Sequence, residues 1–336
     1  MSWTTLLLIS AVLVWARPIA AQASPLRPVA TYSIVARDSV TGQIGVAVQS
    51  HWFSVGAIVS WAEAGVGAVA TQSFVEPSYG PLGIAMMRTG RSAPEALTGL
   101  VASDKDSAVR QVAMIDAQGR VAAFTGKQAI AAAGQHVGRG YSVQANLMER
   151  PTVWGAMAQA FEAAKGDLTE RLLQALEAAE REGGDIRGRQ SAAIIVVGSK
   201  NTGRPWADRL VDLRVEDHPR PLVELRRFVT LSRLYRKMNE GDEWITKKDI
   251  PKAVAAYDAA IAILPDSATN GEAVFWTGIA LAAAGKEREA GPYLSRAYAV
   301  HPKWADLVPE LPAAGLLPQD PGLVSRLVAR MKSAHP

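Results

Sequence analysis

The sequence has 336 residues, of which 49% are hydrophobic and 20% are charged, a composition typical of a globular protein with room for two domains. The formal net charge is only +4, and Lys and Arg are interspersed with Asp and Glu, so no basic stripe indicates a nucleic-acid partner. Cysteine is absent, which excludes disulfides, thiolate metal sites and a cysteine nucleophile.

The N-terminus carries an export signal pattern. Residues 6–15 form the apolar run LLLISAVLVW, and the small residues of Ala21-Gln22-Ala23 follow it, as in a secretory signal peptide. We therefore predict a signal peptide over residues 1–23 and a periplasmic or secreted mature protein. The alternative is an uncleaved anchor, because no Lys or Arg precedes the run. No later segment has the roughly 20 apolar residues of a membrane span, so no membrane association is expected after cleavage.

The mature chain begins with strand-like segments and then mixes strands and helices. Periodicity and turn residues predict, in chain order, an antiparallel pair over 31–38 and 43–50, strand-like residues 56–73, a helix over 81–102, a hairpin over 112–126, a strand over 140–148, a helix over 152–182 with a break near Gly166 and Asp167, strands over 191–200 and 209–218, and a helix over 221–240.

This order of elements indicates the fold class. Strands outnumber helices and occur in antiparallel groups, whereas a doubly wound parallel sheet would alternate strand and helix. The pattern favours an α+β fold in which two antiparallel sheets lie between helices, an αββα sandwich. We assign this fold to residues 24–228 and a separate helical domain to residues 229–336.

The C-terminal third contains an internal repeat. Small, aromatic and proline positions recur at the spacing of a tetratricopeptide unit, first as Gly241, Trp244, Ala253, Tyr257, Ala260 and Pro265, and then as Gly278, Leu281, Ala290, Leu294, Ala297 and Pro302. Small residues allow paired helices to approach closely. The pattern predicts an α-helical, tetratricopeptide-like module that binds a protein partner, and the alternative is an alanine-rich helical bundle.

No cofactor or metal site is expected from the motifs. The sequence has no phosphate-binding loop, HExxH helix or GxSxG elbow. Residues 65–70 loosely match a dinucleotide-binding GxGxxA, but a strand and a turn follow in place of the required helix. The five histidines are isolated along the chain, and each is more typical of a surface or structural residue than of a catalytic one.

The first domain is similar to a known bacterial family. The segments ATYSIVARDSVTGQIGVAVQS, VGAIVSWAEAGVGAVATQ and GRQSAAIIVV resemble the domain of unknown function 1028, over a stretch from about Thr31 to Arg227. That family is grouped by fold with the N-terminal nucleophile (Ntn) hydrolases. The resemblance therefore implies an αββα sandwich of Ntn-hydrolase type.

An Ntn mechanism requires a Thr, Ser or Cys at the start of the first strand, whose own α-amine acts as the base. Thr31 occupies that place, although Ala30 precedes it and the expected signal cleavage lies before Ser24, so exposure of its amine requires a second cleavage. Asn146 is the best candidate for an oxyanion donor, and Ser50 is a further catalytic candidate at a strand end. The candidate substrate-binding residues are Ser33, Gln72, Asp185 and Arg189.

The sequence thus leaves three functional hypotheses. The first is an exported Ntn-type amidohydrolase that acts on a small amide or peptide. The second is a non-catalytic ligand-binding protein on the same fold, in which these polar residues are ordinary hydrogen-bonding groups at strand ends. The third is an interaction scaffold that acts through its repeats. Whether the chain forms a homo-oligomer is left open.

Overall fold

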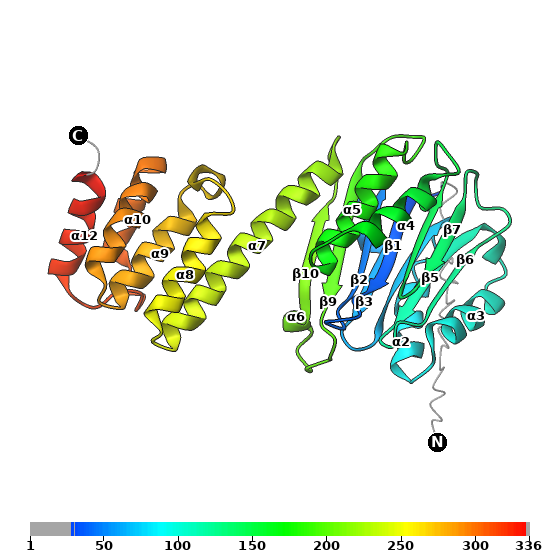
Figure 1. Ribbon diagram of the computed structural model, residues 1–336, viewed down its shortest axis with the longest axis horizontal. Coiled ribbons are helices and arrows are strands. Elements are labelled where there is room, and N and C mark those ends of the chain that lie inside the picture. Colours follow the sequence, from blue (N-terminus) through cyan, green and yellow to red (C-terminus); the bar gives the residue numbers. More distant parts are fainter. Residues whose placement is uncertain (1–27, 30, 334–336) are drawn as a thin grey trace, which may run out of the picture.

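The computed structural model describes residues 28–29 and 31–333. It has a mixed α and β region with antiparallel sheets, followed by a helical C-terminal region (Figure 1). The predicted signal peptide lies outside the described residues. Among the described residues, no helix combines the length and the apolar character needed to cross a membrane.

The larger sheet has six strands in the order β10-β9-β2-β1-β8-β7, and every neighbouring pair is antiparallel. Its central strands are rich in Val, Ile and Ala and are buried along their length, as expected for strands covered on both faces. The strands are β1 (Thr31–Arg37), β2 (Ile44–Ser50), β7 (Gly134–Gly138), β8 (Tyr141–Asn146), β9 (Ser191–Val197) and β10 (Arg209–Val215).

The smaller sheet has four antiparallel strands in chain order, β3 (Ser60–Glu63), β4 (Gly67–Ser73), β5 (Arg110–Asp116) and β6 (Val121–Thr125). Valine, isoleucine and alanine side chains from both sheets form one buried cluster between them. Helices α4 (Val153–Ala163) and α5 (Leu168–Arg181) cover the outer face of the larger sheet, and α2 (Tyr79–Arg88) and α3 (Ala93–Ser103) cover that of the smaller one (Figure 1). The antiparallel pair predicted at the start of the mature chain is confirmed.

Some local predictions need correction. The helix predicted over residues 81–102 is two helices, because Gly90 has a φ of +97° and Ser92 starts α3 with a capping box to Glu95. The segment predicted as strand-like over residues 56–73 begins with a short helix, α1 (Gly56–Val59), before β3. Strand β7 was not predicted, because two of its five residues are glycines and none is fully buried.

The C-terminal region consists of packed helices. Helix α8 packs on the second half of α7 and α10 packs on α9, around two apolar clusters. The helices are α7 (Pro221–Thr246), α8 (Ile250–Ile261), α9 (Glu272–Ala283), α10 (Glu287–Val300), α11 (Trp304–Leu307) and α12 (Pro321–Ser333), and the short α6 (Pro205–Asp208) precedes β10.

Helix α7 joins the two regions without a break, so the boundary predicted at residue 228 falls inside a helix (Figure 1). Its first half contributes Leu222, Leu225 and Val229 to the core beneath α4 and α5. Its second half contributes Leu234 and Met238 to the core of the C-terminal helices. The transition between the two cores therefore lies between residues 229 and 234.

Candidate functional site

Three of the predicted residues lie in one row at the end of the larger sheet. Thr31 opens β1, and the strand register pairs it with Ser50 on β2 and with Asn146 on β8. All three residues are fully buried. The pairing of three separate segments therefore brings together the three side chains proposed for catalysis.

The side chains of Thr31 and Ser33 face the smaller sheet, since alternate residues of a strand share a face. The Ser33 hydroxyl donates to Gln72 Oε1 at 2.6 Å, and Gln72 lies on β4 of the other sheet. Gln72 Nε2 in turn donates to the Thr31 carbonyl oxygen at 3.2 Å. Two predicted substrate-binding residues thus lie in the interior between the sheets, next to Thr31.

A residue that the sequence analysis missed, Gln111 on β5, connects this group. Its Oε1 accepts from Gln72 Nε2 at 2.7 Å and from Asn146 Nδ2 at 3.0 Å. Its Nε2 donates to Thr125 Oγ1 and to the carbonyl oxygen of Ala145, both at 2.9 Å. The signal that could have identified it is a glutamine directly before the apolar run of residues 112–115 in the same strand.

Near Thr31, Asn146 Oδ1 and Ser73 Oγ are buried polar atoms with no hydrogen-bond partner among the described residues. Ser73 ends β4 with a φ of +72°, and Leu147, which follows Asn146, has a φ of +59°. Such backbone conformations are costly for residues other than glycine and often occur at functional sites. Unpaired polar atoms and backbone strain therefore coincide where Thr31 lies.

The segment before Thr31 covers this position in the intact chain. Val29 pairs with Ser73 through two backbone hydrogen bonds, of 2.6 and 3.1 Å. The Thr31 hydroxyl donates to the Val29 carbonyl oxygen at 2.7 Å. An incoming molecule could reach Thr31 from this side only if the preceding segment were displaced or removed.

The remaining two predicted residues lie in the loop between α5 and β9 and have different surroundings. Asp185 accepts from the His51 backbone N–H at 3.0 Å and pairs with Arg187 at 2.8 Å, and Arg187 also donates to the Pro28 carbonyl oxygen at 3.1 Å. Asp185 thus ties the loop to the segment before Thr31. Arg189 instead pairs with Glu180 at 3.4 Å, beside a cavity on the helix side of the larger sheet.

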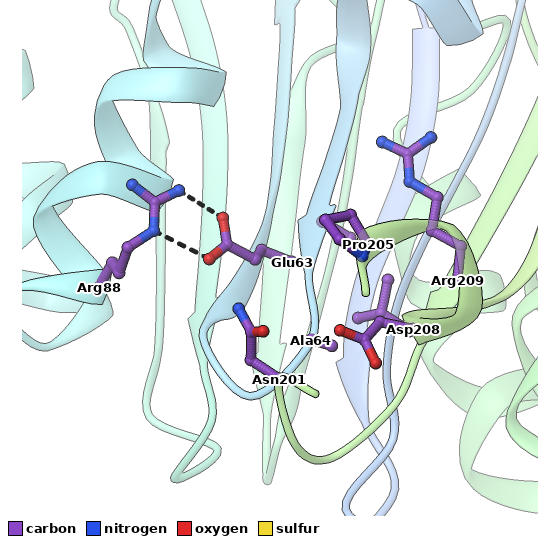
Figure 2. A pocket seen from close by; sticks show the side chains of 9 residues that line it. Glu63, Ala64, Arg88, Asn201, Pro205, Asp208 and Arg209 are labelled. Atoms are coloured by element: carbon purple, nitrogen blue, oxygen red, sulfur yellow. Dashed lines mark hydrogen bonds and ion pairs between the residues drawn. The ribbon is translucent and has the colours of Figure 1, made fainter. Parts of the chain in front are cut away.

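A second cavity, of about 350 Å³, lies at the opposite end of the sandwich, near the ends of β3 and β9 (Figure 2). Arg88 forms a two-fold hydrogen-bonded ion pair with Glu63 at its edge. Asp208 accepts from the backbone N–H and the hydroxyl of Thr202, at 3.0 and 2.6 Å. These charged side chains around the second cavity therefore already have partners within the chain. None of the predicted site residues lines this cavity.

The part of the chain that the structure describes holds no group of three or more His, Asp or Glu side chains placed to bind a metal ion. The group around Thr31 consists of hydroxyl, amide and backbone groups. Such groups can attack or orient a carbonyl compound, given a base to accept the proton of the hydroxyl.

Comparison with known proteins gives a family match that covers the mixed α and β region. The family model described as a family of unknown function, DUF1028, matches residues 31–225. The crystal structure of protein SPO2555 from Silicibacter pomeroyi, assigned to the same family model, is 30% identical in sequence and superposes with a TM-score of 0.54. The alignment covers 60% of this chain and 84% of that one. No curated protein matches the chain. The match spans more than half of the sequence, and the chain therefore belongs to the DUF1028 family.

Proposed function

We propose that this protein is an exported Ntn-type amidohydrolase that acts on a small amide or peptide, with Thr31 as the nucleophile. The observation that carries the proposal is the position of Thr31, the first residue of a central strand, in one row with Ser50 and Asn146. The layering of helix, sheet, sheet and helix supports an Ntn-type sandwich. In this proposal the segment before Thr31 occupies the substrate position until it is removed.

The chemistry would begin with hydrolysis of the Ala30–Thr31 peptide bond, which leaves a free α-amine on Thr31. That amine accepts the proton of the Thr31 hydroxyl while Oγ1 bonds to the carbonyl carbon of the substrate. The Asn146 amide, whose Nδ2 lies 3.5 Å from the Thr31 carbonyl oxygen, would donate to the developing oxyanion. The leaving amine takes the proton, and water then hydrolyses the ester and restores Thr31.

Three of the remaining predicted residues would shape the substrate position. Ser33 and Gln72 hold the backbone and side chains around Thr31, and Asp185 anchors the loop that contacts the covering segment. The C-terminal helices, as a tetratricopeptide-like module, would offer a surface to a protein partner. The close approach of α9 and α10 at Gly278, where an added Cβ would lie 2.6 Å from Leu294 Cγ, supports that assignment.

The test is the N-terminal residue of exported protein, determined by intact-mass analysis, together with hydrolysis of chromogenic amino-acid anilides. We expect active material to begin at Thr31 and Thr31→Ala to abolish turnover. Asn146→Ala should slow turnover by about 10²–10³-fold. Thr89→Ala, which changes a threonine at the end of α2, is the control and should retain full activity.

The same experiment decides against the proposal if protein that retains residues 24–30 is fully active, or if Thr31→Ala keeps turnover. An inactive protein with Thr31 still joined to Ala30 would favour the non-catalytic ligand-binding alternative. One observation already favours that alternative. Thr31 is fully buried while Val29 is hydrogen-bonded to Ser73 beside it. Thermal unfolding of each variant separates a loss of chemistry from a loss of folding.

A further inference from the structure

The helix side of the larger sheet contains a cavity of about 360 Å³ that the proposed chemistry does not use. It lies beneath the C-terminal end of α5 and the loop between α5 and β9. Its volume is at the lower end of the range of about 300–1,000 Å³ found for small-molecule sites. The sheet separates it from the Thr31 hydroxyl, because Tyr32 lines the cavity whereas Thr31 faces the other sheet.

Two polar side chains at its base are buried without partners. Tyr32 on β1 and Gln49 on β2 are paired in the strand register, and both are 0% exposed. Neither the Tyr32 hydroxyl nor either polar atom of the Gln49 amide has a hydrogen-bond partner in the described part of the chain. Burying polar groups without partners destabilises a fold, so such groups indicate a position that a ligand completes.

The rim of the cavity carries charge of both signs. Glu180 pairs with Arg189 through Oε1 at 3.4 Å, but its buried Oε2 has no hydrogen-bond partner among the residues described. Burial raises the pKa of Glu180, although the nearby Arg189 acts to lower it. Glu149 lies exposed at the same rim, whereas the carboxylate of Asp185 is already occupied by Arg187 and the His51 backbone.

These groups define complementary positions for a cation and an anion. The Glu180 carboxylate and the side-chain oxygen Oε1 of Gln49 can accept hydrogen bonds, which suits an ammonium group. The Arg189 guanidinium and the side-chain nitrogen Nε2 of Gln49 can donate hydrogen bonds, which suits a carboxylate. Guanidinium–carboxylate pairs are among the stronger polar contacts. A small molecule that carries both charges would match the two positions together.

We propose that this cavity binds a free amino acid, with its ammonium group on Glu180 and Gln49 and its carboxylate on Arg189 and Gln49. Tyr32 contributes a hydroxyl at the base of the site. The proposal is independent of the hydrolytic function, because Tyr32 and Gln49 line a cavity on the face of the larger sheet opposite to the Thr31 hydroxyl.

Isothermal titration of the full mature chain with each of the twenty common amino acids, supported by thermal-shift measurements, tests the proposal. At least one amino acid should bind and raise the unfolding temperature. Butylamine and butyrate, which each carry one of the two charges, should bind at least tenfold more weakly. Failure of every amino acid to bind at millimolar concentration would overturn the proposal.

Variants identify the site. Glu180→Gln and Arg189→Gln should each weaken binding at least tenfold. Glu63→Gln, which removes a comparable arginine-paired carboxylate beside the other cavity, is the matched control and should bind like the wild type. Equal binding by the wild type, Glu180→Gln and Arg189→Gln would place the ligand elsewhere and contradict the proposal.

Gln49→Met gives a second, distinctive result. Replacing an unpaired buried amide with an apolar side chain of similar length should raise the unfolding temperature of the free protein and abolish the ligand-induced shift. A purely structural Gln49 predicts a lower unfolding temperature and unchanged binding. Thr31→Ala should bind the amino acid with unchanged affinity, so the outcome stays separate from that of the hydrolase proposal.

Discussion

At the scale of single residues, the interior between the two sheets contains buried amides as well as apolar side chains. Gln111 accepts hydrogen bonds from Gln72 and Asn146 and donates to groups on β6 and β8. Satisfied networks of this kind hold strands in one register, whereas a network that loses one member leaves its neighbours unpaired. The residues around Thr31 therefore depend on one another for their positions.

We predict that Gln111→Leu lowers the free energy of unfolding by about 1–3 kcal/mol, because the Gln72 and Asn146 amides would lose an acceptor while buried. Denaturant unfolding measures the change. Gln128→Leu, at an exposed position, is the control and should change the free energy by less than about 0.5 kcal/mol. A stability of Gln111→Leu equal to that of the wild type would show that the network contributes nothing to folding.

At the scale of elements, the close packing of α8 on α7 depends on a glycine, which has no side chain to keep the two helices apart. Gly241 lies in the second half of α7, where the ring of Tyr257 on α8 packs against it. An added Cβ would lie 2.3 Å from Tyr257 Cε1, well inside contact distance. Tyr257 cannot easily move away, because it is fully buried and its hydroxyl donates to Asp242 at 2.6 Å.

Gly241→Ala should therefore destabilise the C-terminal helices by about 1–2 kcal/mol, since overpacking outweighs the better helix propensity of alanine. Gly155→Ala in α4 is the matched control, because an added Cβ there meets no atom within 4 Å. That variant should be neutral or more stable by up to about 1 kcal/mol. If both variants gain stability in denaturant unfolding, the packing of α7 on α8 is looser than the structure indicates.

At the scale of the whole molecule, α7 binds the two regions together. Arg226 pairs with Glu170 and Glu177 on α5, and Arg233 pairs with Asp167 and again with Glu170. Burial alone would raise the pKa of Glu170, but hydrogen bonds from Gln174, Arg226 and Arg233 outweigh it and the pKa is lowered. The first half of α7 is thus part of the first region in both its apolar and its ionic contacts.

Two truncations should consequently behave differently. A chain that ends at Arg236 retains the Leu222, Leu225 and Val229 contacts and the ion pairs of Arg226 and Arg233. It should remain folded, with a cooperative thermal transition by circular dichroism. A chain that ends at Arg220 loses them and should unfold at a lower temperature or aggregate, because the apolar surface they cover becomes exposed. Aggregation of the longer chain as well would show that the C-terminal helices are required for folding of the first region.

The sequence by itself determined most of the segments that form strands and helices, because alternating or helical spacing of apolar residues is a local property. It missed β7, whose glycines interrupt that spacing. Together with the family resemblance, it also indicated Thr31, Ser50 and Asn146 individually, as candidates near strand ends. What it could not provide is the set of neighbours of each residue. Register and sheet stacking join residues far apart in the chain, such as Ser33 and Gln72, and no local pattern encodes those distances.

Only the tertiary structure could reveal Gln111 as the centre of the buried network and Gln49 as an unpaired amide, since each looks like an ordinary strand glutamine in the sequence. The domain boundary predicted at residue 228 falls inside α7 for a similar reason, because only the folded chain shows which core each half of the helix joins. Helical periodicity continues without interruption through α7, so nothing local marks the change from one core to the other. That change is decided by which neighbouring surfaces the two halves of the helix cover, and those surfaces exist only in the folded chain.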